Sequence, residues 1–384
     1  MIRMAIRMIM GDRLKFFGLL VGLAFASMLI TQQAAIFLGY TTRMWAFIDD
    51  VPAPDIWVMD PQVLFTEDFK PIADTAVNRV RSVEGVAWAV PMYKSGLPVR
   101  LADGSLQVCT IVGVDDATLI GAPPAMIEGT HHDLRQADAV IIDARTAASD
   151  LRVRDASGGT RPLRPGDELS VNDRTARVVG VANLTTPFYW QPVIYTTYSR
   201  AITWAPPQRR QLTYVLVKAA EGRDVATLAR HIEDRTGLRA MPRDEFIRMT
   251  AAYTLDKTGI LINFGITVAL GFVIGLLSSG QTFFNYVADN LKTFGALKAL
   301  GLGNAGLLRL IVVQVLVVGL LGFGIGAGLA AFTGTVFASI GMGFHLPWQL
   351  LVGSVVSILL ICAAAALLAS IRVLRLEPAI VFKG

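Results

Sequence analysis

The chain has 384 residues, of which 53% are hydrophobic and 17% are charged, and its mean hydropathy is +0.51. This composition fits a membrane protein that also carries a polar domain. The two cysteines exclude a disulfide framework, because Cys109 lies in the polar part of the chain and Cys362 lies in an apolar stretch.

Three stretches without any charged residue divide the chain, at 16–42, 258–288 and 310–371. The first two are each long enough for one membrane crossing of about 20 residues, and the third is long enough for two. We therefore predict an α-helical membrane protein with four transmembrane helices, one before and three after a large extracytoplasmic α+β domain.

The predicted segments follow one another in a simple order. They are an amphipathic cytoplasmic N-terminus (1–15), the first span (16–40), the extracytoplasmic domain (41–257), the second span (258–283), a cytoplasmic coupling loop (284–309), the third span (310–335), a short external turn (336–346), the fourth span (347–371) and a cytoplasmic tail (372–384). A cleaved signal peptide is the alternative for the first span, but its apolar run exceeds the roughly 7–15 residues of a signal core.

Segregated charges predict the orientation of the spans. Residues 39–258 contain 25 of the 35 Lys and Arg residues and 27 of the 30 Asp and Glu residues, a net charge of −2, whereas the rest of the chain carries +7. The positive residues that fall outside the range 39–258 lie before the first span, between the second and third spans, and after the last span. Because cytoplasmic loops are enriched in Lys and Arg, both termini are predicted to face the cytoplasm of a bacterial inner membrane.

The polar domain has the pattern of a split ferredoxin-like unit. Its expected elements are strands at 55–60, 86–93 and 97–114 with a hairpin turn at 102–105, a helical pattern at 69–83, and later a strand at 212–219, a helix at 225–236 and a strand at 238–241. Short β-runs between the two halves predict a β-rich insertion over about 115–207.

An aromatic run lies near the end of this insertion. Phe188, Tyr189 and Trp190 follow a proline and form a candidate tip that contacts an adaptor or a ligand. Core packing of the same residues is an equally open interpretation.

Small residues recur in the third span. Gly322 with Gly326 and Gly324 with Gly328 form two overlapping small-xxx-small pairs, and Gly319 adds to the same low-profile surface, which permits close approach of helices in lipid. Such a surface serves either the seam of a homodimer or packing against a neighbouring span of the same chain, and the pattern does not choose between them. Gly271 and Gly275 repeat the device in the second span.

The inner loop between the second and third spans is the expected functional segment. Apolar residues at Leu291, Phe294, Leu297 and Leu300 have helical spacing, and Gly301 is placed to end the helix. An ordinary connector between two spans is the alternative, with Lys292 and Lys298 only setting the topology.

Catalytic and ion-coupling motifs are not found. The sequence has no G-x-x-x-x-G-K-[ST], H-E-x-x-H, C-x-x-C or G-x-S-x-G motif, and no Asp, Glu, Lys or Arg lies within a span. We therefore expect no enzyme activity, catalytic residue, metal site or cofactor in this chain, and no nucleic-acid partner.

Two motifs and the layout resemble the permease subunits of MacB/FtsX-type (type VII) ABC transporters, nearest the DevC-like branch. The motifs are KTFGALKALG at 292–301 and RVLRLEPAIVF at 372–382. In this resemblance the ATPase-coupling helix comprises Leu291, Lys292, Thr293, Phe294, Gly295, Leu297, Lys298, Leu300 and Gly301. Thr293 departs from the acidic residue that the family often has there, so a contact made by that carboxylate does not carry over.

The resemblance implies a mechanism called mechanotransmission. A separate cytoplasmic ABC ATPase binds ATP and Mg, and its motion passes through the spans of a homodimeric permease to the extracytoplasmic domain. A periplasmic adaptor, the membrane-fusion protein, completes an efflux or extrusion system for a hydrophobic or amphipathic cargo. The alternative is a non-transporting FtsX-like regulator of an extracytoplasmic cell-wall hydrolase.

Overall fold

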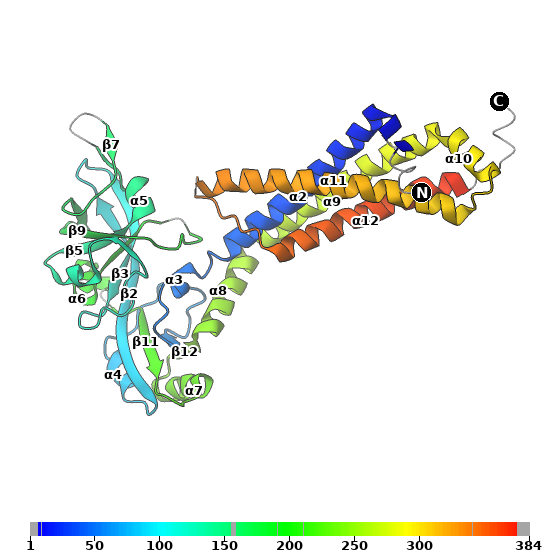
Figure 1. The fold of residues 1–384 in the computed structure, drawn as a ribbon. Helices are drawn as coiled ribbons and strands as arrows, with labels where there is room; N and C mark the ends of the chain where they lie inside the picture. The colour runs from blue at the N-terminus through cyan, green and yellow to red at the C-terminus, as the bar shows by residue number, and fades with distance from the viewer. Residues whose placement is uncertain are drawn as a thin grey trace. The chain divides into compact units, whose positions relative to one another are not determined.

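The computed structural model describes residues 7–8, 10–154, 159–189, 191–209, 211–339 and 341–374. Two compact units divide the chain. The helical unit comprises Met1–Tyr40 and Thr258–Gly384, and the sheet domain comprises Thr41–Lys257. Figure 1 labels many of the elements of both units.

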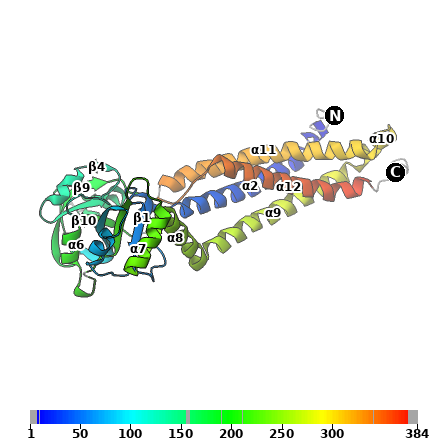
Figure 2. The same ribbon diagram turned by 90° about the horizontal axis from the view of Figure 1, so that it is seen from below.

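Long apolar helices build the helical unit. They are α2 (Arg13–Thr41), α9 (Ile260–Asp289), α11 (Asn304–Ser339) and α12 (Trp348–Leu374), with the short α10 (Leu291–Ala299) between α9 and α11. Each of the four long helices has the length and apolar composition needed to span a membrane. They run alongside one another in both ribbon views (Figures 1 and 2). The predicted arrangement of one helix before and three after the polar domain is confirmed.

Close helix contacts form the core of this unit. In α9, Gly275 lies against Ala26 of α2 and Ile361 of α12, and in α11, Gly319 lies against Cys362 of α12. The buried core contains side chains from every long helix, among them Leu23, Phe283, Val315 and Ile361. The apolar face of each helix therefore packs on the others, and the opposite faces of the spans remain exposed.

The sheet domain is built on the predicted split ferredoxin-like unit. Its elements are β1 (Ile56–Met59), α4 (Ala76–Arg81), β2 (Val86–Arg100), β11 (Tyr214–Ala219), α7 (Val225–Thr236) and β12 (Arg239–Pro242). The strand order β12-β1-β11-β2 is antiparallel throughout. Buried residues of α4 and α7, such as Val80 and Ile232, pack on this sheet. The fold class expected from the sequence is confirmed.

The same sheet continues through β3 (Leu106–Val114), which pairs with β2 and leads into the insertion. The elements that follow are β4 (Met126–Glu128), η1 (His131–Arg135), β5 (Ala139–Asp143), α5 (Ala144–Ala148), β6 (Val153–Arg154), β7 (Thr160–Arg161), β8 (Glu168–Val171), β9 (Arg174–Ala182), β10 (Val193–Thr197), α6 (Tyr198–Trp204) and η2 (Pro207–Arg209). The full order is β12-β1-β11-β2-β3-β10-β5-β9-β4, with β8 paired to β2 and β9. Two further helices, α3 (Ala46–Asp49) and α8 (Arg243–Thr258), lie at the ends of the domain.

Two local predictions were wrong. The strand expected to break between Tyr93 and Leu97 is continuous, because Lys94, Ser95 and Gly96 all pair with β3. The helix expected from residue 69 begins only at Ala76, since the amide of Ile72 is used in a bridge to Leu212. Side-chain periodicity does not reveal either long-range pairing.

Candidate functional site: the helix between the second and third spans

The helix α10 has a well-defined end. Gly301 adopts the left-handed conformation with φ of 93°. Its N–H donates to the carbonyl of Lys298 at 3.1 Å, and the N–H of Leu302 donates to the carbonyl of Leu297 at 3.0 Å. This is the hydrogen-bond pattern of a Schellman motif, in which glycine is favoured at the left-handed position. The sequence therefore stops α10 at a fixed residue before α11 begins.

One face of α10 is anchored in the core of the helical unit. Phe294 is fully buried, together with Phe283, Tyr286 and Leu307 from the flanking helices. Leu291 and Leu297 are half-buried and pack against the same core. Burial of one large aromatic side chain contributes on the order of 2–3 kcal/mol. These three residues therefore anchor α10 to the core, and the buried Phe294 is not available to contact a partner.

A polar link beneath α10 joins α9 to α11. The side-chain amide of Gln314 donates to the hydroxyl of Tyr286 at 3.1 Å in a buried position. The side-chain amide of Asn290 donates to the carbonyl of Tyr286 at 2.9 Å. Sequence reasoning missed this link, although Gln314 is a lone amide in an apolar run and would have signalled it.

The opposite face of α10 is exposed. Lys292, Thr293, Ala296 and Ala299 lie on it, and Leu300 at the end of the helix has 84% of its surface exposed. Lys298 is half-buried, Gly301 is exposed, and Gly295 is buried on the anchored side. The structure thus brings the predicted coupling residues onto one short helix but divides them between two faces.

An ion-pair group connects the start of α2 to the end of α9. The ammonium group of Lys15 lies 2.8 Å from the carboxylate of Asp12 and also pairs with the carboxylate of Asp289. The hydrogen bond from Lys15 lowers the pKa of Asp12. Exposed pairs of this kind contribute little stability.

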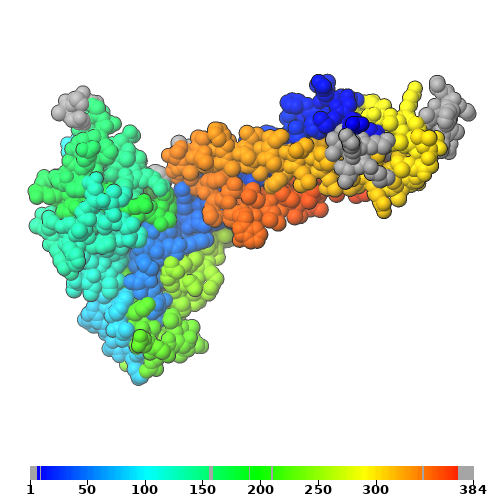
Figure 3. All heavy atoms as spheres, viewed as in Figure 1, coloured from blue at the N-terminus to red at the C-terminus, as the bar shows by residue number. Residues whose placement is uncertain are grey.

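The glycines of α11 divide into two sets. A methyl group added at Gly322 would lie 2.8 Å from Leu23, one at Gly326 would overlap the backbone of α2, and Gly319 meets Cys362. Gly324 and Gly328 have no atom within 4 Å of such a methyl group. The first set serves packing within the chain, and the second set faces outward on α11, which forms much of the visible surface of the helical unit in Figure 3.

The candidate aromatic tip belongs to a cluster in the sheet domain. Phe65 stacks on Tyr253 of α8 with ring centroids 4.7 Å apart, and its ring lies 5.8 Å from that of Tyr189. Tyr189 keeps 39% of its surface exposed, and Phe188 is half-buried. Trp190 lies outside the described residues. Tyr189 therefore packs against Phe65 and also leaves part of its side chain exposed to solvent.

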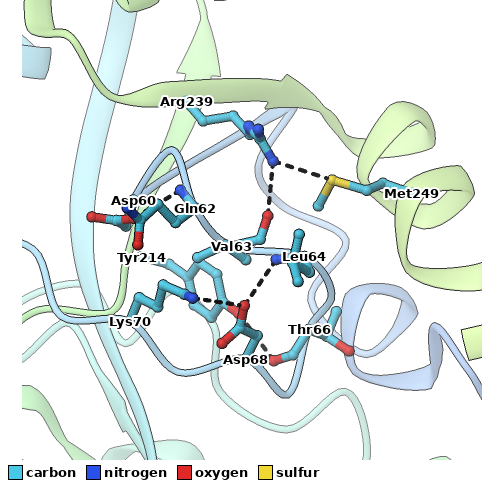
Figure 4. A network of polar contacts seen from close by, with 10 residues as sticks. All are labelled: Asp60, Gln62, Val63, Leu64, Thr66, Asp68, Lys70, Tyr214, Arg239 and Met249. Carbon is cyan, nitrogen blue, oxygen red and sulfur yellow. Dashed lines mark hydrogen bonds and ion pairs between the residues drawn. The ribbon is translucent and has the colours of Figure 1, made fainter. Parts of the chain in front are cut away.

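A network of polar contacts holds the loop that carries Phe65. The hydroxyl of Tyr214 donates to the carbonyl of Thr66 at 3.0 Å, and the guanidinium group of Arg239 donates to the carbonyl of Val63 at 2.8 Å. Asp68 accepts from the amide of Leu64 at 3.0 Å and pairs with Lys70 (Figure 4). These bonds fix a loop that has little regular secondary structure of its own.

A buried lysine lies behind the same loop. Lys94 of β2 is 2% exposed, its ammonium group lies 2.6 Å from the carboxylate of Glu67, and it stands over the ring of Phe47 at 3.8 Å. Burial lowers the pKa of Lys94, and the charge of Glu67 opposes that shift. Within the part of the chain that the structure describes, no three His, Cys, Asp or Glu side chains are grouped so as to hold a metal ion.

One spanning helix before a large α+β domain, three spanning helices after it, and a short helix between two of the spans are the features of a class of membrane permease. The chain matches the model of the MacB-like periplasmic core domain over residues 18–235 and that of the FtsX-like permease C-terminal region over residues 264–378. The first match covers more than half of the sequence, and the chain belongs to this family. It is a permease of the MacB/FtsX type, without ATPase activity of its own, and its sheet domain is extracytoplasmic.

Solved structures with similarity to the chain include three domains. The extracellular domain of the noncanonic ABC-type transporter YknZ from Gram-positive bacteria shares 16% identity, covering 49% of this chain and 98% of that one, with a TM-score of 0.34. The periplasmic region of MacB from Actinobacillus actinomycetemcomitans shares 14% identity over 55% and 96%, with a TM-score of 0.37. A domain of a permease protein from Porphyromonas gingivalis shares 17% identity over 49% and 90%, with a TM-score of 0.33. No curated protein matches the chain.

Proposed function

We propose that the protein is the permease subunit of an efflux or extrusion system in which α10 receives force from a separate cytoplasmic ATPase. The observation that carries this proposal is that α10 is buried on one face and exposed on the other. Phe294 fixes one face in the core, whereas Lys292, Thr293 and Leu300 are exposed on the other. A helix that is rigidly held on one side and free on the other transmits a push to the spans that hold it.

The remaining parts of the system follow from this role. The loop that contains α10 and both termini of the chain lie on the cytoplasmic side of a bacterial inner membrane. ATP and Mg bind to the partner ATPase. Gly324 and Gly328 provide the homodimer seam, because they are the outward-facing members of the predicted set. A periplasmic adaptor binds the extracytoplasmic domain, Tyr189 being a candidate contact, and the cargo is hydrophobic or amphipathic. Among MacB/FtsX-type systems we place the chain nearest the DevC-like branch.

The test is to co-express the full chain with its ATPase and to measure co-purification and ATP hydrolysis in proteoliposomes. We expect Leu300→Asp to abolish co-purification and stimulated hydrolysis without changing the stability of the permease, because this side chain is exposed. Leu64→Asp, at an exposed leucine of the sheet domain, is the matched control and should change neither.

Two results would count against the proposal. Normal coupling in the Leu300→Asp variant would show that α10 is only a connector between spans. Normal coupling without export, together with activation of an added cell-wall hydrolase, would instead identify the FtsX-like regulator.

A further inference from the structure

The strand β3 is paired on both sides over only part of its length. Its pairing with β2 extends from Leu106 to Gly113, over all but the last residue of the strand. On its other side β10 pairs only with Thr110–Val114, because β10 begins at Val193. The preceding residue, Pro192, accepts a bond from the N–H of Thr110 at 2.8 Å but has no N–H to continue the ladder. Among the described residues, Leu106, Gln107 and Val108 therefore form an edge that continues from the paired part of β3.

Hydrogen-bond alternation shows which amides face this edge. Next to the turn, the N–H of Leu101 donates to the carbonyl of Ser105, so residues 101 and 105 form a hydrogen-bonded pair. In an antiparallel ladder the next pair, Arg100 with Leu106, is non-hydrogen-bonded, as is Pro98 with Val108. The N–H and C=O groups of Leu106 and Val108 thus point away from β2. Within the described part of the chain no backbone partner meets them.

The side chains at this edge are apolar and exposed. Leu106 and Val108 lie on one face with 58% and 54% of their surfaces exposed. Pro98 and Arg100 are exposed opposite them on β2, and Arg100 forms no ion pair with any described residue. Natural edge strands are usually guarded by a lysine, a proline or a bulge, and the segment 106–108 contains none of these.

We propose that the β3 edge, residues 106–108, binds an extended segment of a partner protein outside the membrane by adding it as a strand. The added strand carries apolar side chains at alternate positions, beside Leu106 and Val108, and a glutamate that reaches Arg100. Two strand spacings, about 10 Å, separate such a strand from β2, and the extended Arg and Glu side chains together span this distance. The inference rests on the proposed function only in taking its partner from outside the membrane.

Charge favours a different protein over a second copy of the chain. Edge-to-edge pairing of two copies would set the two apolar pairs together, but residues 106–108 contain no acidic residue that could pair with Arg100 of the other copy. A partner strand with one carboxylate satisfies the exposed guanidinium group, and charge complementarity of this kind selects among partners more than it adds affinity.

The test uses the full chain in detergent micelles and a dye-labelled peptide of alternating valine and threonine with one central glutamate. Binding is followed by fluorescence anisotropy. Val108→Pro removes the outward N–H while leaving the ladder to β2 intact, and Val108→Thr keeps it as the matched control. We expect the proline variant to bind at least about tenfold more weakly and the threonine variant to bind as the wild type does. Arg100→Glu should shift the preference to a peptide with lysine in place of glutamate.

A second peptide keeps the test valid if the proline variant fails to fold. N-methylation of the peptide amides on alternate residues blocks strand pairing on one side, and it should abolish binding to the unchanged protein. Equal binding of the methylated peptide, or of both Val108 variants, would overturn the proposal. A third result would also overturn the proposal. If the wild type bound no peptide and Val108→Pro dissociated a dimer of the protein, the edge would be assigned to pairing with a second copy. None of these outcomes bears on coupling through Leu300, which the ATPase assay tests separately.

Discussion

Gly326 of α11 should tolerate no side chain, whereas Gly324 on the same helix should accept one. A methyl group at Gly326 would lie 2.6 Å from the Cβ of Ser27 and 2.8 Å from the amide of Met28, about 0.8 and 0.6 Å less than the 3.4 Å at which ordinary contact begins. It would also overlap the carbonyl oxygen of Ala24. Since backbone atoms cannot rotate out of the way, α2 and α11 must separate.

The magnitude follows from comparing the two alanine variants. Overpacking of a tight contact costs about 1–3 kcal/mol. Alanine also gains about 1 kcal/mol over glycine in a helix, but this gain is common to Gly326→Ala and Gly324→Ala and cancels in their difference. We therefore expect Gly326→Ala to be about 1–3 kcal/mol less stable than Gly324→Ala.

The assay is equilibrium unfolding of the full chain in mixed micelles by titration with sodium dodecyl sulfate. Equal free energies of unfolding for the two variants would refute the assignment of Gly326 to packing within the chain. Self-association of the protein is measured in the same micelles. If the outward-facing glycines form a dimer seam, Gly324→Ala should weaken self-association and Gly326→Ala should not.

Three further predictions concern the sheet domain and are measured by thermal unfolding of the full chain. Lys94→Ala should cost about 3–5 kcal/mol by breaking the buried pair with Glu67, whereas Lys94→Met, which keeps the volume, should cost less; equal losses would contradict this. Burial raises the pKa of Asp50, so the wild type should gain stability relative to Asp50→Asn as the pH falls from 7 towards 4, and a flat difference would refute it. Trp57→Ala should cost about 3–5 kcal/mol, because Trp57 is fully buried, and Trp57→Phe should cost less; a loss under about 1 kcal/mol would contradict full burial.

The architecture was predictable because its signals are local and strong. Charge-free runs mark spans directly, and the strand–helix–strand pattern whose helix ends at Gly237 needs only neighbouring residues. The left-handed conformation of Gly237, with φ of 69°, is the expected helix stop. Such features depend on residues that are adjacent in sequence, and the structure confirms them.

The parts that failed depend on residues far apart in the chain. The continuity of β2 through Lys94 is set by pairing with β3, and the late start of α4 is set by the bridge between Ile72 and Leu212. Helical spacing also grouped Phe294 with Leu300, although the fold buries one and exposes the other. An apolar stripe predicts which face is buried only when it is known what covers that face.

The two segments that join the sheet domain to the spans are bound to each other inside that domain. Arg243, the first residue of α8, donates to the carboxylate of Asp49 in α3 at 2.5 Å. The ring of Trp57 in β1 contacts those of Phe47 and Phe246, with centroids 5.9 and 5.7 Å apart. Because α3 and α8 pack on the same aromatic core as β1, we expect that displacement of either helix moves β1 as well and does not separate α3 from α8. Movement of this domain as a unit is what the proposed transmission of motion requires.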